Sequence, residues 1–206
     1  MTLAIIPAAG FGTRMNMAPD QSKEMLIDST GKPVIQWCLD RCRDADISPL
    51  VVTRKEKKDL IQYLQDNSVP HMVIKPEGEW MDTVLATSPH WQYQNLLFLP
   101  DIRFTNTFVI HKLLANLDDL EIDLCIGTHE VTDCIKWGMV NDQIDCLAEK
   151  PSSWNTNTAW GLLAFKPLAG QRILRKFKEK GITFKHNFSV YSLGEFKDIT
   201  RSGKLE

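Results

Sequence analysis

A glycine-rich turn near the amino terminus brings together residue types that bind phosphate. The apolar run at residues 3–6 is typical of a buried strand, and Gly10 and Gly12 follow it in the segment AAGFGTRM. Glycines after a strand let the backbone turn tightly enough for its N–H groups to approach phosphate oxygens. Arg14 and Lys23 add two cations on the same approach. This arrangement predicts a loop that handles a phosphorylated ligand.

Two common phosphate motifs do not fit this loop. A P-loop ends in Gly-Lys-Ser/Thr, whereas here the glycines lead into Thr13 and Arg14 and the lysine comes later. The dinucleotide-binding fingerprint needs a third glycine that opens a helix, and Met15 stands in its place. The loop therefore belongs to another class of phosphate site.

The wider segment IPAAGFGTRM…SKEMLIDSTGKPVIQW resembles the amino-terminal signature of the sugar-phosphate nucleotidylyltransferases. It looks closest to the bacterial UTP:glucose-1-phosphate uridylyltransferase branch and the related thymidylyltransferases. The shared features are G-x-G-T-R-M, Lys23 in a Lys-Glu-Met-Leu segment, and the following Gly-Lys-Pro. The resemblance implies an α/β, three-layer Rossmann-like nucleotide-diphospho-sugar transferase fold with a mixed, mostly parallel central sheet. It also implies one nucleotidyltransferase domain over residues 1–206.

The resemblance assigns roles to the residues of the loop. Arg14 and Lys23 are expected to be catalytic, with Arg14 on the departing pyrophosphate and Lys23 on the charge at the α-phosphorus. The expected nucleotide-binding residues are Ala8, Ala9, Gly10, Gly12, Thr13 and Gly78. Gly78 stands for the turn glycine of the base-reading segment, but the usual threonine-alanine pair is absent from this stretch. UTP and dTTP are both compatible with it, CTP less so, and the sugar stays open.

Two aspartates are expected to hold Mg²⁺. Asp101 follows the apolar run NLLFLP, and ligands of open α/β sheets lie beyond the carboxyl ends of strands. From position alone Asp101 fits a helix cap or turn equally well. The resemblance makes Asp101 one magnesium ligand and Asp198, in GEFKDIT, the second, although Phe196 and Arg201 depart from the family pattern there.

The segment Glu149-Lys150-Pro151 is expected to line a sugar-phosphate pocket. Read without the resemblance, it is a common turn at a strand end. In the resembled family an E-K-P segment lies between an earlier F/W-G-V and a later glycine, in the order seen here. The implied sugar-phosphate site consists of Gly138, Glu149, Lys150 and Gly161.

The implied activity is condensation of a nucleoside triphosphate with a sugar 1-phosphate to give a nucleotide sugar and pyrophosphate. The implied partners are these two substrates, and a homo-oligomer is compatible with the resemblance. A non-catalytic homologue that binds a nucleotide sugar and regulates a partner is the main alternative. A molybdenum-cofactor-type or other small nucleotidyltransferase is a second alternative, which shares the glycine loop and the lysine but not Glu-Lys-Pro.

Composition argues against several classes of protein, namely nucleic-acid-binding, membrane-spanning and secreted ones. The chain has 206 residues, 24 Lys and Arg against 26 Asp and Glu, and a formal charge of -2, so it has no electrostatic case for binding nucleic acid. No apolar stretch reaches the roughly 20 residues that span a bilayer, and no charged region precedes the first apolar run as in a signal peptide. The five cysteines form no C-x-x-C pair, which favours reduced, buried thiols and a cytoplasmic location.

Strand-like and helical patterns alternate, as in a mostly parallel sheet with right-handed crossovers. Beyond Trp137, shorter runs around an Asn-Asp turn predict a partly antiparallel sector for the second substrate. Strands are predicted at residues 3–6, 50–53, 72–74, 96–99, 124–128, 138–140 and 144–149, and helices at 34–44, 55–65, 81–87 and 107–117.

Overall fold

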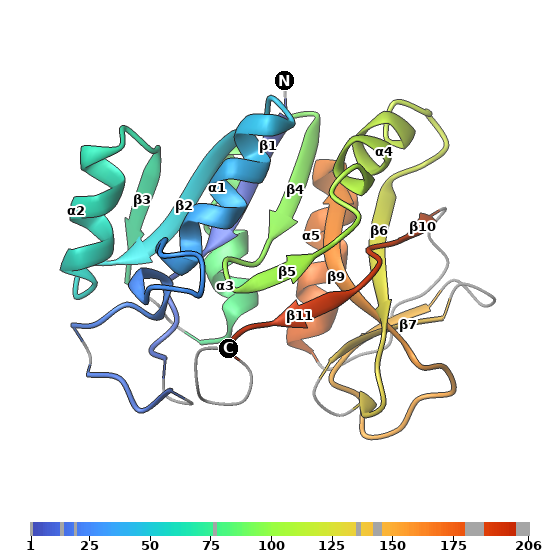
Figure 1. The fold of residues 1–206 in the computed structure, drawn as a ribbon. Helices are drawn as coiled ribbons and strands as arrows, with labels where there is room; N and C mark the ends of the chain where they lie inside the picture. Colours follow the sequence, from blue (N-terminus) through green and yellow to red (C-terminus); the bar gives the residue numbers. More distant parts are fainter. Residues whose placement is uncertain are drawn as a thin grey trace.

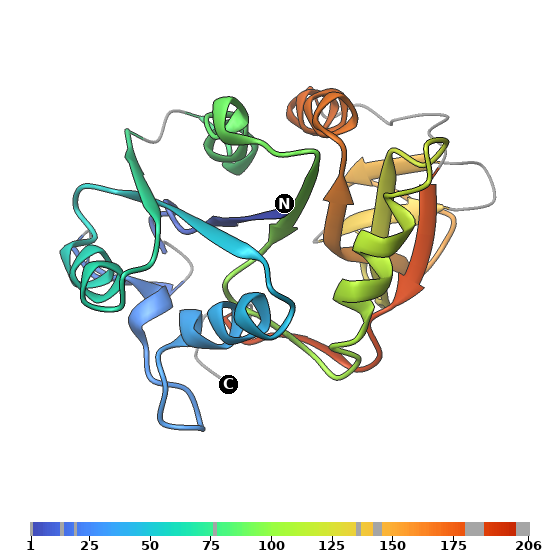
Figure 2. The ribbon, with the colours of Figure 1, turned by 90° about the horizontal axis from the view of Figure 1, so that it is seen from above.

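The structure is a twisted sheet with helices on both faces (Figure 1) (Figure 2). This computed structural model describes residues 2–12, 15–18, 20–75, 78–134, 137–141, 146–179 and 188–200. The strands are β1 (Thr2–Pro7), β2 (Ser48–Arg54), β3 (His71–Ile74), β4 (Gln94–Phe98), β5 (Ile102–Phe104), β6 (Leu124–Glu130), β7 (Gly138–Asn141), β8 (Cys146–Glu149), β9 (Thr158–Phe165), β10 (Phe188–Ser192) and β11 (Phe196–Asp198). The helices are α1 (Val34–Asp44), α2 (Lys58–Asp66), α3 (Trp80–Leu85), α4 (Val109–Asn116) and α5 (Pro167–Lys178), with short 3-10 turns η2 (Lys23–Met25) and η3 (Ser88–His90).

Nine of the described strands form one mixed sheet. Its order is β10-β6-β9-β4-β1-β2-β3, and β7 and β8 attach beside β9. Strands β1 to β4 pair in parallel, whereas β9 runs antiparallel to both of its neighbours. The carboxyl ends of β1 and β4 therefore lie side by side, where α/β sheets bind ligands. The predicted fold class, α/β with a mixed and mostly parallel sheet, is confirmed.

Two apolar cores make the sheet a middle layer. On one face α1, α2 and α4 bury side chains such as Cys38, Leu60 and Leu113 against the strands. On the other face α3 and α5 bury Val84 and Phe177 (Figure 2). Burial of both faces explains why the central strands are continuous apolar runs and not alternating ones.

The predicted elements agree with the structure in kind and differ at their ends. The predicted helix 34–44 is α1, with Pro33 just before it where its fixed φ suits a helix start. Helix α2 begins at Lys58, later than predicted, because β2 continues to Arg54 and a turn follows, closed by a hydrogen bond from Lys57 N to Arg54 O of 3.1 Å.

The partly antiparallel sector is also present. Strands β7 and β8 pair antiparallel, and the predicted turn between them lies outside the described residues. Strand β9, helix α5 and strand β10 were not predicted individually, although β9 is the apolar run TAWGLLAF. Its place between β4 and β6 follows from tertiary pairing, which no local pattern encodes.

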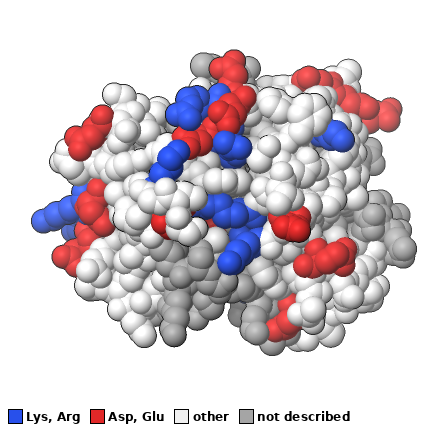
Figure 3. All heavy atoms as spheres, viewed as in Figure 1, with Lys and Arg blue, Asp and Glu red and all other residues white. Residues whose placement is uncertain are grey.

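Charges are mixed on the face viewed in Figure 3. Blue and red side chains alternate there over the region of α1, without a broad area of one sign. In the part of the chain that the structure describes, no helix combines the length and the apolar character needed to traverse a bilayer.

Thiol reactivity tests the predicted state of the cysteines. Cys38, Cys42 and Cys125 are fully buried, and burial raises the pKa of the Cys42 and Cys125 thiols to about 12. Because the thiolate is the reactive form, we expect an aromatic disulfide reagent at pH 8 to modify only the partly exposed Cys134 and Cys146 in the native protein. Five thiols should react after denaturation. Rapid reaction of a third thiol in the native state would contradict this packing.

Candidate active site

A pocket of about 300 Å³ opens beyond the carboxyl ends of β1 and β4. Its wall also includes residues of β7, β8, β9 and β11, so both halves of the sheet contribute. The predicted site residues on this wall are Ala9, Gly10, Lys23, Gly78, Asp101, Gly138, Glu149, Lys150, Gly161 and Asp198. Residues predicted for four different roles (catalysis, nucleotide binding, metal binding and sugar-phosphate binding) thus share one cavity.

The glycine-rich loop forms one side of the pocket. Ala8 and Ala9 are buried at the end of β1, and Ala8 N donates to Val52 O over 2.7 Å. Gly12 adopts a φ of +65°, a conformation that L side chains rarely adopt. Apart from the two neighbours of Gly10 in the chain, no heavy atom of the described residues lies within 4 Å of the position that a Cβ on Gly10 would take, which leaves room for a ligand against the backbone.

Thr13 and Arg14 lie outside the described residues, so their expected roles stay predictions. Ala8 and Gly12 belong to the described loop but not to the pocket wall as described.

Lys23 and Asp101 form an ion pair at the floor of the pocket. Thr200 supports it, since its Oγ1 donates to Asp101 Oδ2 over 2.7 Å. Burial by itself would raise the pKa of the Asp101 carboxyl, but the Lys23 ammonium and the Thr200 hydroxyl outweigh burial and hold that pKa below its ordinary value. Burial by itself would lower the pKa of Lys23, and Asp101 and Glu24 outweigh it in the other direction. Both members of the pair are therefore charged at neutral pH.

Asp198 reaches the same floor from the far end of the chain. Strand β11 pairs antiparallel with β5 so that Asp198 lies opposite Ile102, and Ile199 N donates to Asp101 O over 3.0 Å. Thr200 N also donates to Asp198 Oδ1 over 3.1 Å. The structure thus brings both predicted metal ligands to one point, held by backbone pairing.

The donor chemistry of this point suits Mg²⁺. Mg²⁺ is commonly bound by one or two carboxylates together with substrate phosphates and water. The described residues contain no group of three or more His, Cys, Asp or Glu side chains that could hold a metal without a substrate. The charged side chains on the pocket wall are five carboxylates and two lysines among the described residues, so two phosphate anions entering it need added positive charge.

The opposite wall is the hairpin of β7 and β8. Gly138 lies opposite Glu149 in this hairpin, and Lys150 N donates to Trp137 O over 2.9 Å. Lys150 has a φ of +49°, which is uncommon for a residue with a side chain, and strain of this kind clusters at ligand sites. Its ammonium lies 3.4 Å from Glu149 Oε1, and its side chain is half-exposed.

Packing explains two glycines predicted for the sugar-phosphate site. A Cβ on Gly138 would stand 1.7 Å from Trp160 Nε1, and a Cβ on Gly161 would stand 2.6 Å from the Phe196 ring. Each glycine thus makes room for an aromatic ring that itself lines the pocket. The glycines shape the cavity through these two rings.

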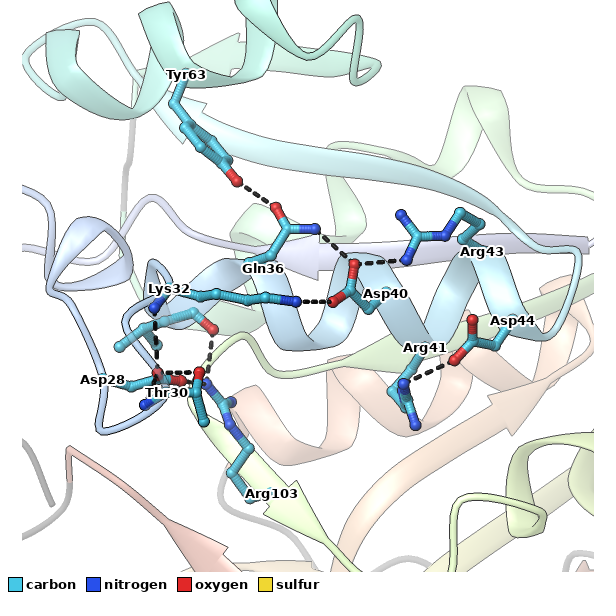
Figure 4. A network of polar contacts seen from close by, with 11 residues as sticks. Asp28, Thr30, Lys32, Gln36, Asp40, Arg41, Arg43, Asp44, Tyr63 and Arg103 are labelled. Carbon is cyan, nitrogen blue, oxygen red and sulfur yellow. Dashed lines mark hydrogen bonds and ion pairs between the residues drawn. The ribbon is translucent and has the colours of Figure 1, made fainter.

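A polar network ties the segment after Lys23 to the strand after Asp101 (Figure 4). Arg103, on β5, donates to Val34 O over 2.8 Å and pairs with Asp28 at 3.3 Å. Its guanidinium also lies over the Trp37 ring, 5.1 Å from the centroid. The two chain segments that supply the Lys23–Asp101 pair are therefore anchored to each other outside the pocket.

Several lining residues were not predicted as site residues. Phe11 and Glu24 are neighbours of predicted residues, and proximity in sequence was an available signal for them. Glu79, Trp80 and Thr83 follow Gly78 in the sequence, and only the turn glycine was singled out in that stretch.

Comparison with models of protein families shows the family of this chain. Residues 4–176 match the family model described as the MobA-like NTP transferase domain. The chain belongs to this family. The match contains the glycine loop, Lys23, Asp101, Glu149 and Lys150, and it ends before β11 and Asp198. No curated protein sequence matches the chain.

Two solved structures share the fold of this MobA-like domain. One is a putative glucose-1-phosphate thymidylyltransferase from Bacillus anthracis in complex with a sucrose, with a TM-score of 0.76 and 16% identity over 99% of this chain and 91% of that chain. The other is a UDP-glucose pyrophosphorylase complexed with UDP-glucose, with a TM-score of 0.74 and 17% identity over 99% of this chain and 94% of that one. The family match and the shared fold confirm the predicted resemblance to the sugar-phosphate nucleotidyltransferases.

Proposed function

We propose that this MobA-like domain condenses a nucleoside triphosphate with a sugar 1-phosphate, forming a nucleotide sugar and pyrophosphate. One observation carries the proposal: Lys23 and Asp101 share a single pocket with Glu149 and Lys150. The first two come from the side predicted to bind the triphosphate, and the last two come from the segment that resembles a sugar-phosphate site. Transfer between two phosphorylated substrates needs such a common cavity, because it depends on holding both in line.

The reaction requires no side-chain nucleophile. An oxygen of the sugar phosphate forms a bond to the α-phosphorus, and the bond from the α-phosphorus to the oxygen bridging to the β-phosphate breaks. Pyrophosphate leaves with the electron pair of the broken bond. In this proposal Lys23 stabilises the negative charge at the α-phosphorus, and Arg14 stabilises the departing pyrophosphate.

Asp101 and Asp198 are the residues that would hold Mg²⁺. When bound, the ion supplies positive charge that offsets the repulsion between the two substrates' phosphate oxygens. Lys150 would pair with the sugar phosphate, and Glu149 would accept hydrogen bonds from sugar hydroxyls. Gly138 and Gly161 would shape the surface against which the sugar lies.

The nucleotide is proposed to be UTP or dTTP. The two structures with the same fold are named for thymidylyl transfer and for UDP-glucose, which supports a pyrimidine base. Gly78 has a φ of +85° and lines the pocket, and in this proposal it would be the turn glycine of the base-reading segment. The loop residues Ala8, Ala9, Gly10, Gly12 and Thr13 would surround the triphosphate.

The family match also fits a molybdenum-cofactor-type nucleotidyltransferase. The Glu149-Lys150 segment favours the sugar phosphate, since it lines the pocket and a molybdenum-cofactor-type enzyme is expected to lack Glu-Lys-Pro. A non-catalytic regulator is disfavoured because Arg14, Lys23, Asp101, Lys150 and Asp198 are all retained, and a chain without the chemistry has no physical need for all five.

A pyrophosphate-release screen tests the proposal. UTP, dTTP, CTP, ATP and GTP are each combined with a panel of sugar 1-phosphates and Mg²⁺. We expect at least one pair containing UTP or dTTP to release pyrophosphate, and we expect EDTA to abolish the release because the pocket carries an excess of carboxylates.

Titration calorimetry with UDP-glucose and dTDP-glucose separates the enzyme from the regulator. Tight binding of a nucleotide sugar, with no pyrophosphate formed or consumed by any pair in either direction, would establish the regulatory alternative. Release with a purine triphosphate alone would refute the proposed base.

A further inference from the structure

A buried ion pair lies directly behind the glycine-rich loop. Lys57 and Glu24 are 1% and 0% exposed, and Lys57 Nζ lies 2.6 Å from Glu24 Oε2. The same ammonium donates to Ala8 O over 2.7 Å. One lysine therefore holds the end of β1 and the turn η2, the two segments that carry the phosphate-binding residues.

Burying this ion pair is energetically less favourable than filling the same space with apolar side chains. Removing two charges from water is unfavourable, and well-packed apolar residues often stabilise a fold as well as a buried pair does. Burial lowers the pKa of the Lys57 ammonium, while Glu24 acts in the opposite direction. Unlike an apolar group, the Lys57 ammonium can hold two separate acceptors at hydrogen-bond distance.

The start of α2 makes a second contact with the same turn. Asp59 Oδ1 accepts a hydrogen bond from Ser22 Oγ over 2.5 Å, and Asp59 Oδ2 accepts one from Ser22 N over 3.2 Å. Ser22 and Glu24 flank Lys23 in the sequence. The residues on both sides of Lys23 are thus held, Ser22 by Asp59 of α2 and Glu24 by Lys57 just before α2, while the side chain of Lys23 itself pairs with Asp101.

We propose that Lys57 is a positioning residue for nucleotidyl transfer, and that together with Asp59 it sets the place of Lys23 relative to the glycine-rich loop. Neither Lys57 nor Asp59 belongs to the pocket wall as described, so each acts through the residues that it holds. The inference rests on the proposed function for its catalytic consequence. Its structural part concerns phosphate binding alone and is tested separately.

The test uses three altered proteins, Lys57→Met, Glu24→Met/Lys57→Met and Asp59→Ala, with Lys166→Met as the matched control. Lys166 also donates to a backbone carbonyl, Asp119 O at 2.8 Å, and its side chain is 13% exposed, but it does not line the pocket as described. For each protein we measure the affinity for inorganic pyrophosphate by calorimetry, the thermal midpoint, and kcat and KM with the active substrate pair.

Lys57→Met is expected to weaken pyrophosphate binding about tenfold and to lower kcat/KM for the triphosphate about 100-fold, since small misplacements of aligned groups have effects of that order. It also leaves Glu24 buried without its ammonium and lowers the midpoint. The double variant removes both charges, so its midpoint should return toward wild type while its binding and turnover stay impaired. Asp59→Ala should shift binding in the same direction by less, and Lys166→Met should change neither binding nor kcat/KM.

A double variant with both the stability and the turnover of wild type would overturn the inference, because the pair would then only support the fold. Wild-type protein that binds pyrophosphate but releases none from any pair would refute the proposed function, while the binding comparison would still decide the role of Lys57. Wild-type protein that does not bind inorganic pyrophosphate would refute both. Unchanged pyrophosphate affinity in Lys57→Met and Asp59→Ala would refute the positioning role alone.

Discussion

Asp101→Asn is expected to lower the rate of pyrophosphate release by at least about 100-fold, the usual scale for losing one group that stabilises transition-state charge. The substitution keeps the shape of the side chain and removes the negative charge of the carboxylate that, in the proposal, would hold Mg²⁺. The measurement is the initial rate with the active substrate pair over a range of Mg²⁺ concentrations. Asp198→Asn is expected to act in the same direction.

The same substitution also affects folding, because Asp101 pairs with Lys23 in a nearly buried site. The Lys23 ammonium is then left without its partner, and we expect the free energy of unfolding to fall by about 3 kcal/mol. A cycle with Lys23→Met separates the two effects. The double variant Lys23→Met/Asp101→Asn should recover stability, since no unpaired charge remains, and should stay inactive.

The stability difference between wild type and Asp101→Asn should depend on pH. The pKa of Asp101 lies below its ordinary value of 3.8 in the folded protein, so its contribution is complete above that value and is lost as the pH falls through the folded pKa. The two unfolding free energies should therefore converge in acid.

Near-normal turnover of Asp101→Asn at limiting Mg²⁺ would contradict the assignment of Asp101 as a metal ligand.

Lys150→Met is expected to impair use of the sugar 1-phosphate and to leave the KM for the triphosphate unchanged. The loss of one charge-assisted contact corresponds to about 1.5 to 3 kcal/mol, or a factor of roughly 10 to 150 in kcat/KM for the sugar phosphate. The structural reason is that Lys150 and Glu149 lie on the β7–β8 side of the pocket, while Lys23 lies on the β1 side. Initial rates with each substrate varied in turn give the two constants.

Lys176→Met is the matched control for this prediction. Lys176 is 45% exposed against 55% for the Lys150 side chain, and it also pairs with a glutamate, Glu179 at 2.7 Å. It lies on α5 and does not line the pocket as described. A Lys150 variant that changes only the triphosphate dependence would place the sugar phosphate elsewhere in the cavity.

Local sequence was sufficient to predict the parts of the site that lie within short stretches of chain. The apolar run before Gly10 and Gly12 predicted β1 and the loop that follows it, because strand and turn preferences depend on near neighbours. The run before Asp101 placed that aspartate at the end of β4 for the same reason. Helix α1 was predicted with its observed bounds, since apolar periodicity and Pro33 mark it locally.

Tertiary structure decided which of these stretches meet. Asp198 reaches Asp101 only because β11 pairs with β5, and β9 enters the sheet antiparallel between β4 and β6. The pair of Lys57 with Glu24 was not anticipated, because a lysine at a helix start ordinarily projects into water. Whether such residues touch depends on strand register and on how helices pack on the sheet. Those are set by the burial of the whole core, and no short segment of sequence contains them.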